Sequence, residues 1–159
     1  IALAVPQFLL FAKLNLTNTP WAMIIPSLVS TFGLYLMWIF SEQAVPTELL
    51  EAARVDGAGE LRTFFQVSLP LLAPGIVTTA LFSIVATWNN YFLPLVRLAD
   101  SQLYPITLGL NNWLGQVDRL PEFYELTTGG VLLSVIPLVI AMIVLQRFWR
   151  GGLTEGAVK

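Results

Sequence analysis

The chain has 159 residues, of which 56% are hydrophobic and only 11% are charged. Soluble domains are about one-quarter charged, so this composition indicates a membrane protein. It contains no histidine or cysteine, which excludes a Ser-His-Asp triad, thiol catalysis, disulfides and Cys/His zinc sites within the chain. Its net charge is −2, so it lacks the positive charge that nucleic-acid binding requires.

Three long stretches of the sequence contain no charged residue. No Asp, Glu, Lys or Arg lies at 14–41, 63–96 or 126–146. Each stretch can hold the roughly 20 residues that cross a bilayer as a helix. A soluble protein with three such stretches would have too little polar surface to cover them. The sequence therefore predicts an all-α, polytopic transmembrane helical bundle.

The first two elements in chain order are apolar helices. Residues 1–12 are too short to span a membrane and lack the basic region and cleavage site of a secretory signal, so they predict the end of a truncated helix. After a loop rich in turn-forming residues, a full span is expected at 21–40. Pro26 and Gly33 lie inside this span, which a membrane helix tolerates where neighbouring helices satisfy the backbone.

The rest of the chain predicts two more spans within one domain. Residues 63–69 are expected to lie along the membrane interface. The other elements are a charged cytoplasmic loop (41–70), a third span (72–95), an external loop (97–125), a last span (126–145) and a cytoplasmic tail (146–159). This orientation leaves Lys13, Arg97 and Arg119 outside, which agrees with the positive-inside rule by a small margin.

The charged loop predicts a short helix that begins at about Thr47. Pro46 stops the preceding helix, and Thr47 is expected to be the N-cap. Glu48 and Glu51 lie in the first turn, where carboxylates favour the positive end of the helix dipole. Gly57 is placed to end this helix in the left-handed conformation.

A second amphipathic helix is expected at 60–69 and should be closed by Pro70. Glu51 and Arg54 are three residues apart, a spacing at which opposite charges can pair. Two short helices hinged at 57–59 would form a compact cytoplasmic knob. The alternative interpretation is an ordinary surface hairpin.

The order of motifs adds a family resemblance. Glu51-Ala52-Ala53, a spaced Gly57 and then Val67-Ser68-Leu69-Pro70 resemble the EAA loop of binding-protein-dependent importer permeases, with Val67 in place of the usual Ile. The stretches 88–94 and 150–159 are also similar to carbohydrate-type permeases, including the inner-membrane subunits of maltose transporters. The resemblance covers essentially the whole chain in the correct order and identifies it as the C-terminal part of an ABC importer permease.

The resemblance implies that the EAA loop is a coupling helix, which docks into a cleft on a separate ATPase. It implies that Glu51 pairs with a basic residue of that ATPase. The residues implied in ATPase coupling are Glu51, Ala52, Ala53, Arg54, Asp56, Gly57, Leu69 and Pro70. The chain has no phosphate-binding loop of its own, so ATP and Mg²⁺ are expected on the partner, and the chain needs no cofactor.

The resemblance also implies that the tail reaches between two ATPase subunits. The tail residues implied in this contact are Gly151, Gly152, Leu153, Thr154 and Gly156, whose glycines allow close backbone approach. A frayed, glycine-rich terminus is the alternative. Two or three further spans are implied before residue 1.

Two sets of polar residues are candidates for solute handling. Trp88, Asn89, Asn90 and Tyr91 are expected to face the interior of the bundle, because an unpaired amide in lipid is costly. Substrate contact is one role for them, and anchoring at the membrane interface is the other. The resemblance also makes the external stretch 111–118 a candidate contact for a solute-binding protein, through Asn111, Asn112 and Gln116. An inert loop is the alternative.

The sequence therefore predicts a multi-pass permease of a bacterial or archaeal inner membrane, with no catalytic or metal-binding residues. Its expected partners are a second permease subunit, an ATPase dimer, an extracytoplasmic binding protein and membrane lipid. An intramembrane enzyme is disfavoured because the spans hold no ionisable pair. A passive channel or scaffold would not need a docking knob. The solute is expected to be a sugar or oligosaccharide, with glycerol phosphate or a polyol as the alternative.

Overall fold

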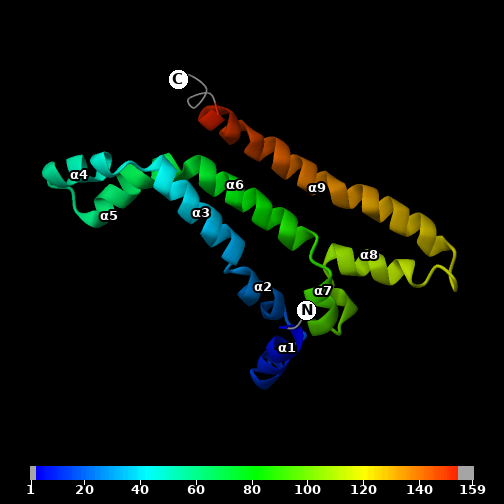
Figure 1. Ribbon diagram of the computed structural model, residues 1–159. Helices are drawn as coiled ribbons and strands as arrows, with labels where there is room; N and C mark the ends of the chain where they lie inside the picture. Colours follow the sequence, from blue (N-terminus) through cyan, green and yellow to red (C-terminus); the bar gives the residue numbers. More distant parts are fainter. Residues whose placement is uncertain (1–2, 154–159) are drawn as a thin grey trace. The chain divides into compact units, whose positions relative to one another are not determined.

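The computed structural model describes residues 3–153, with side chains described as far as Gln146. All regular elements in this part of the chain are helical, which confirms the predicted all-α class. In chain order (Figure 1) they are α1 (Ala4–Lys13), α2 (Trp21–Ser27), α3 (Thr31–Ala44), α4 (Thr47–Val55), α5 (Glu60–Thr63), the π-helical turn η1 (Phe64–Ser68), α6 (Leu69–Trp88), α7 (Phe92–Arg97), the 3₁₀ turn η2 (Ser101–Leu103), α8 (Ile106–Leu114) and α9 (Glu122–Leu153).

Three helical stretches are long and apolar enough to cross a membrane. They are Trp21–Ala44, Glu60–Trp88 and Glu122–Gln146. Each overlaps one of the charge-free stretches of the sequence. Their side chains are mostly exposed, as expected for apolar helices that lie in lipid rather than in water.

The helical stretch Glu60–Trp88 differs at both ends from the third span predicted at 72–95. Residues 63–69 do not form a separate interfacial helix closed by Pro70, because α5, η1 and α6 follow one another without a break. Pro70 has no N–H to donate to the carbonyl of Gln66. The chain adopts a π-helical turn just before it, in which the Leu69 N–H bonds to the Phe64 carbonyl, so the helix continues through the proline.

At its other end, the helix stops at Trp88 and not at residue 95. The side chain of Asn89 turns back to donate to the Val85 carbonyl (2.8 Å), and Asn90 Oδ1 accepts the N–H of Leu93 (3.4 Å) at the start of α7. Asparagine side chains compete with the backbone for hydrogen bonds in this way and so favour helix ends.

The first predicted span is also interrupted. Helix α2 ends at Ser27, directly after Pro26, and α3 begins after Ser30, whose hydroxyl oxygen accepts the N–H of Gly33 (3.0 Å). Pro26 cannot donate to the carbonyl of Ala22, four residues earlier. That carbonyl therefore needs another donor.

The chain divides into two compact units. One combines 3–29 with 84–140, and the other combines 30–83 with 141–153. In the second unit, α3 and α6 pack antiparallel, and their ring-to-ring contact is Phe32 against Phe82 at 5.9 Å. A methyl group added to Gly33 would lie 3.0 Å from Thr79 Cγ2, so the two helices approach closely where this glycine lies.

Gly75 marks the tightest point of the α3–α6 contact. A methyl group there would overlap the ring of Phe40. We expect Gly75→Leu to lower the stability of the subunit by about 1–3 kcal/mol through overpacking, measured as a lower unfolding temperature of the purified permease. Gly129→Leu is the matched control, since open space surrounds Gly129 in α9. Equal unfolding temperatures for the two variants would contradict this packing.

Candidate functional site

The first candidate site is the knob formed by α4, the turn at 56–59 and α5. Helix α4 begins at Thr47, as predicted, but Thr47 is not its N-cap. Pro46 occupies that position with an extended backbone (φ −61°, ψ 139°), and no side chain caps the helix. Proline fixes this φ without needing a donor, so the ring of Pro46, rather than a threonine hydroxyl, sets the start of α4.

The end of α4 confirms the role predicted for Gly57. Its φ is +76°, in the left-handed region. The N–H of Gly57 bonds to the Arg54 carbonyl and the N–H of Ala58 bonds to the Ala53 carbonyl, both at 3.0 Å. This pair of bonds is a Schellman motif, and it turns the chain sharply from α4 into α5.

The charge pairing within the knob differs from the predicted one. Arg54 pairs with Glu60 across the turn, with Nη2 to Oε1 at 3.0 Å and Nε to Oε1 at 3.2 Å. Glu51 is exposed and makes no hydrogen bond or ion pair within the described part of the chain. The ion pair between Glu51 and Arg54 that their spacing predicted is therefore wrong. The chain reverses at Gly57, which brings Glu60 within hydrogen-bonding distance of Arg54.

The other predicted coupling residues fall into two groups. Ala52, Ala53 and Asp56 belong to the knob with Glu51, Arg54 and Gly57, whereas Leu69 and Pro70 begin the long helix α6. The helix that contains α5 and η1 joins the two groups without a flexible linker. The knob is thus continuous with a candidate membrane span.

The second candidate site is a polar junction in the unit that contains α7 and α8. Two hydrogen bonds form it: Tyr91 Oη donates to Asn111 Oδ1 (3.1 Å), and Thr107 Oγ1 donates to the Asn90 carbonyl (3.1 Å). The junction therefore joins two sets of residues that the sequence suggested separately, one around Trp88–Tyr91 and one on α8.

The remaining predicted members lie beside this junction. Trp88 is the last residue of α6, and the side-chain amide of Asn89 donates a hydrogen bond to the Val85 carbonyl. Asn112 is exposed on α8, and Gln116 Nε2 donates to the Asn112 carbonyl at 3.5 Å. The α8 helix is also anchored to α9, since Trp113 and Phe123 lie 6.2 Å apart between ring centroids.

The structure adds one buried charge that the sequence did not single out. Arg97 is only 2% exposed. Its Nη1 donates to the Ala22 carbonyl (2.8 Å), its Nη2 donates to Gln7 Oε1 (2.6 Å), and its guanidinium carbon lies 4.8 Å from the centre of the Phe11 ring. Burial lowers the pKa of this guanidinium, which stays charged because arginine does not deprotonate in proteins.

Asn18 holds the same region together from the other side. It adopts a left-handed φ of 56°. Its Oδ1 accepts the N–H groups of Ala99 (2.9 Å) and Asp100 (2.8 Å), and its own N–H donates to the Arg97 carbonyl (2.9 Å). The sequence indicated only a turn here, because nothing local shows that Asn18 meets residues about 80 positions later.

The tail predicted to contact the ATPase lies at the end of α9 and beyond it. Gly151, Gly152 and Leu153 continue the backbone of α9, and Thr154 and Gly156 lie outside the described residues. Within the residues that the structure describes, no group of three or more His, Cys, Asp or Glu side chains could hold a metal ion.

Comparison with known proteins identifies relatives along the whole chain. An arabinooligosaccharides transport system permease protein of Halalkalibacterium halodurans is 34% identical over 99% of this chain and 55% of its own length. A putative ABC transporter permease protein of Streptomyces antibioticus is 34% identical over 100% of the chain and 69% of its own length. A melibiose/raffinose/stachyose import permease protein of Bacillus subtilis is 35% identical over 76% of the chain and 42% of its own length.

The chain therefore spans only part of the length of these relatives, from 42% to 69%. The model of one family matches residues 1–150. Its description as an inner membrane component agrees with the three candidate spans, which fit a multi-pass membrane protein. The chain therefore belongs to the family of binding-protein-dependent transport system inner membrane components.

Proposed function

We propose that this chain forms the membrane-embedded part of a permease subunit in an ATP-driven importer of sugars or oligosaccharides. A separate ATPase drives transport by binding α4. The observation that carries this proposal is the knob itself: α4 ends in a Schellman turn, its Glu51 has no partner in the described chain, and the turn continues directly into a candidate span.

Several properties of the knob favour a docking role over an ordinary surface hairpin. Helix α4 lies outside the three candidate spans, yet Leu49 is 44% exposed and Val55 is 88% exposed. Exposed apolar side chains beside an unpaired carboxylate are typical of a helix that fits into a groove on another protein. The Schellman turn fixes the direction of α4, and the exposed Arg54–Glu60 pair bridges the same turn, so docking would occur with little loss of conformational freedom.

The rest of the assembly follows from the same proposal. The ATPase dimer holds the ATP and Mg²⁺, a second permease subunit completes the pathway, and an extracytoplasmic binding protein delivers solute to the side of α8. The tail from Gly151 onward is proposed to contact the ATPase as well. Relatives named as permeases for arabinooligosaccharides and for melibiose/raffinose/stachyose support a carbohydrate as the solute.

Charge reversal at Glu51 tests the proposal without knowledge of the solute. In the complete importer, Glu51→Lys is expected to reduce the ATPase retained on a tagged full-length permease at least tenfold. The new lysine would face the basic ATPase residue with which Glu51 is proposed to pair, and like charges at an interface cost several kcal/mol. The measurement is the ATPase-to-permease ratio after detergent purification, with membrane insertion checked by immunoblot.

Glu42→Lys is the matched control. Glu42 is exposed in the last turn of α3, outside the knob. A lysine there suits the negative end of the helix dipole better than a glutamate does, so ATPase retention should be unchanged. Normal retention and normal solute uptake in Glu51→Lys would refute the coupling role.

A further inference from the structure

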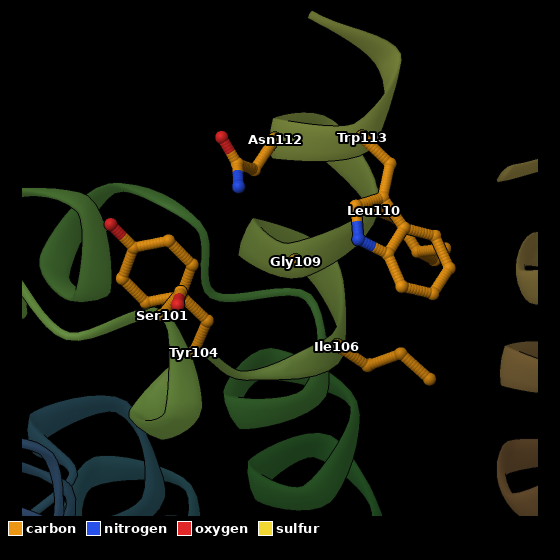
Figure 2. A pocket seen from close by; sticks show the side chains of 7 residues that line it. All are labelled: Ser101, Tyr104, Ile106, Gly109, Leu110, Asn112 and Trp113. Atoms are coloured by element: carbon orange, nitrogen blue, oxygen red, sulfur yellow. The ribbon is translucent and has the colours of Figure 1, made fainter. Parts of the chain in front are cut away.

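A pocket opens beside α8, next to the polar junction. Its volume is about 240 Å³. Figure 2 shows Gly109 between Tyr104 and Ser101 on one side and Trp113 on the other, with Asn112 extending from the next turn of the helix. All of these residues belong to one unit, and most of them were not among the solute-handling residues suggested by the sequence.

The lining combines two kinds of groups. Ser101, Tyr104 and Asn112 supply hydroxyl and amide groups, which both donate and accept hydrogen bonds. Trp113 and Ile106 supply apolar surface. A sugar ring has the same two faces, since its C–H groups pack on aromatic and aliphatic side chains while its hydroxyl groups need hydrogen-bonding partners. Sites of this composition bind small molecules through a few placed polar groups on an apolar wall.

The charge of the lining selects among the possible solutes. None of the seven lining residues is Asp, Glu, Lys or Arg. A phosphate group would find no cationic partner here, although phosphate sites are typically built from Arg or Lys. The pocket therefore disfavours glycerol phosphate and suits a neutral polyhydroxyl compound.

Size and rigidity restrict the ligand further. The volume lies below the roughly 300 Å³ at which pockets for drug-sized ligands begin, so one sugar ring fills the pocket and any further rings of an oligosaccharide would extend outside it. The wall is held in place at two points, by the Tyr91–Asn111 hydrogen bond and by the Trp113–Phe123 contact. A site built on a braced helix needs little ordering when the ligand arrives.

We infer that this pocket is a sugar-binding subsite, which holds one neutral pyranose ring of the solute between α8 and the η2 segment. The inference rests on the proposed importer function and assigns it a solute class at a defined place. Gly109 is the residue that leaves room for the ring, because a side chain there would project into open space.

The main test fills the pocket with a side chain at Gly109. The probes are methyl α-glucopyranoside and methyl α-galactopyranoside, and binding to the complete full-length importer in nanodiscs is measured by saturation-transfer NMR, without ATP or binding protein. We expect saturable binding of at least one of these sugars. Gly109→Leu should weaken it at least tenfold, and Asn112→Ala should weaken it severalfold.

Gly129→Leu is the control for the pocket-filling change. Gly129 is also a helical glycine with open space around it, and it does not line the pocket, so sugar binding should be unchanged. Failure of both sugars to bind, equal binding by Gly109→Leu and the unmodified protein, or displacement of the sugar by glycerol 3-phosphate would each overturn the inference. ATPase retention on the same complex reports separately on the proposed function.

Discussion

Replacing Gly57 with proline is expected to abolish ATP-driven transport while the permease remains inserted in the membrane. Gly57 has a φ of +76°, and its N–H bonds to the Arg54 carbonyl. Proline fixes φ near −65° and has no N–H, so the Schellman turn cannot form. Helix α4 would then leave the chain in a different direction, and its docking surface would no longer match the ATPase. Solute uptake by the complete importer is the measurement.

The same substitution two residues later provides the matched control. Gly59 has a φ of −72° and a ψ of 160°, which is close to the conformation that proline prefers. Its N–H makes no hydrogen bond within the described part of the chain, and no other group lies within 4 Å of its missing side chain. Gly59→Pro should therefore retain most of the uptake, at equal subunit levels.

The variant Gly57→Ala tests the effect of the left-handed backbone conformation separately from the loss of the N–H that proline also causes. Gly57→Ala keeps the N–H but places a Cβ in the left-handed region, at a cost of about 1–2 kcal/mol. We expect reduced but measurable uptake from Gly57→Ala. Equal uptake by Gly57→Pro and Gly59→Pro would show that the direction of the turn does not matter for coupling.

The turn at Gly57 was predictable because its cause is local. The helix pattern, the terminating glycine and the bounding Pro46 all lie within a dozen residues, and each acts through backbone sterics alone. The charge-free stretches predicted the membrane spans equally well, because each span is formed by one continuous segment of the sequence. The long helices therefore followed from the sequence, with errors confined to their ends.

Those errors arise where two local signals compete. Pro70 was expected to stop a helix, yet the π-helical turn at Phe64–Ser68 carries the helix past it. Asn89 and Asn90 were assigned to the interior of a span, but their side chains bond to the backbone and end α6 at Trp88. Which signal prevails depends on what packs around the segment.

The polar junction and the buried arginine could not be read from the sequence for a different reason. Their bonds join residues that are far apart in the chain, such as Gln7 and Arg97, and no local pattern indicates such a pairing. One signal could have suggested that a donor was needed: Pro26 leaves the Ala22 carbonyl without its helical partner. The sequence shows this need but does not identify Arg97 as the donor.

Replacing Arg97 with methionine is expected to destabilise the unit that contains α1, α2 and α7 by about 3–5 kcal/mol, because one buried and one partly buried acceptor lose charge-assisted hydrogen bonds. The acceptors are the Ala22 carbonyl and Gln7 Oε1. Methionine keeps a flexible apolar chain over the Phe11 ring, so the change removes the charge more than the packing. The measurement is the unfolding temperature of the purified permease. Arg119→Met, an exposed arginine in the same predicted loop, should leave it unchanged.

A second substitution tests whether Pro26 is the reason that Arg97 is needed. Pro26→Ala restores an N–H that can bond to the Ala22 carbonyl within α2. In the Arg97→Met background, Pro26→Ala should therefore recover part of the lost stability, whereas in the unmodified protein the new N–H competes with an existing donor and should gain less. This non-additivity is what a double-mutant cycle measures for two groups that share one partner. Additive effects would mean that Arg97 stabilises the unit through Gln7 and Phe11 alone, and that the proline and the arginine are independent features of the fold.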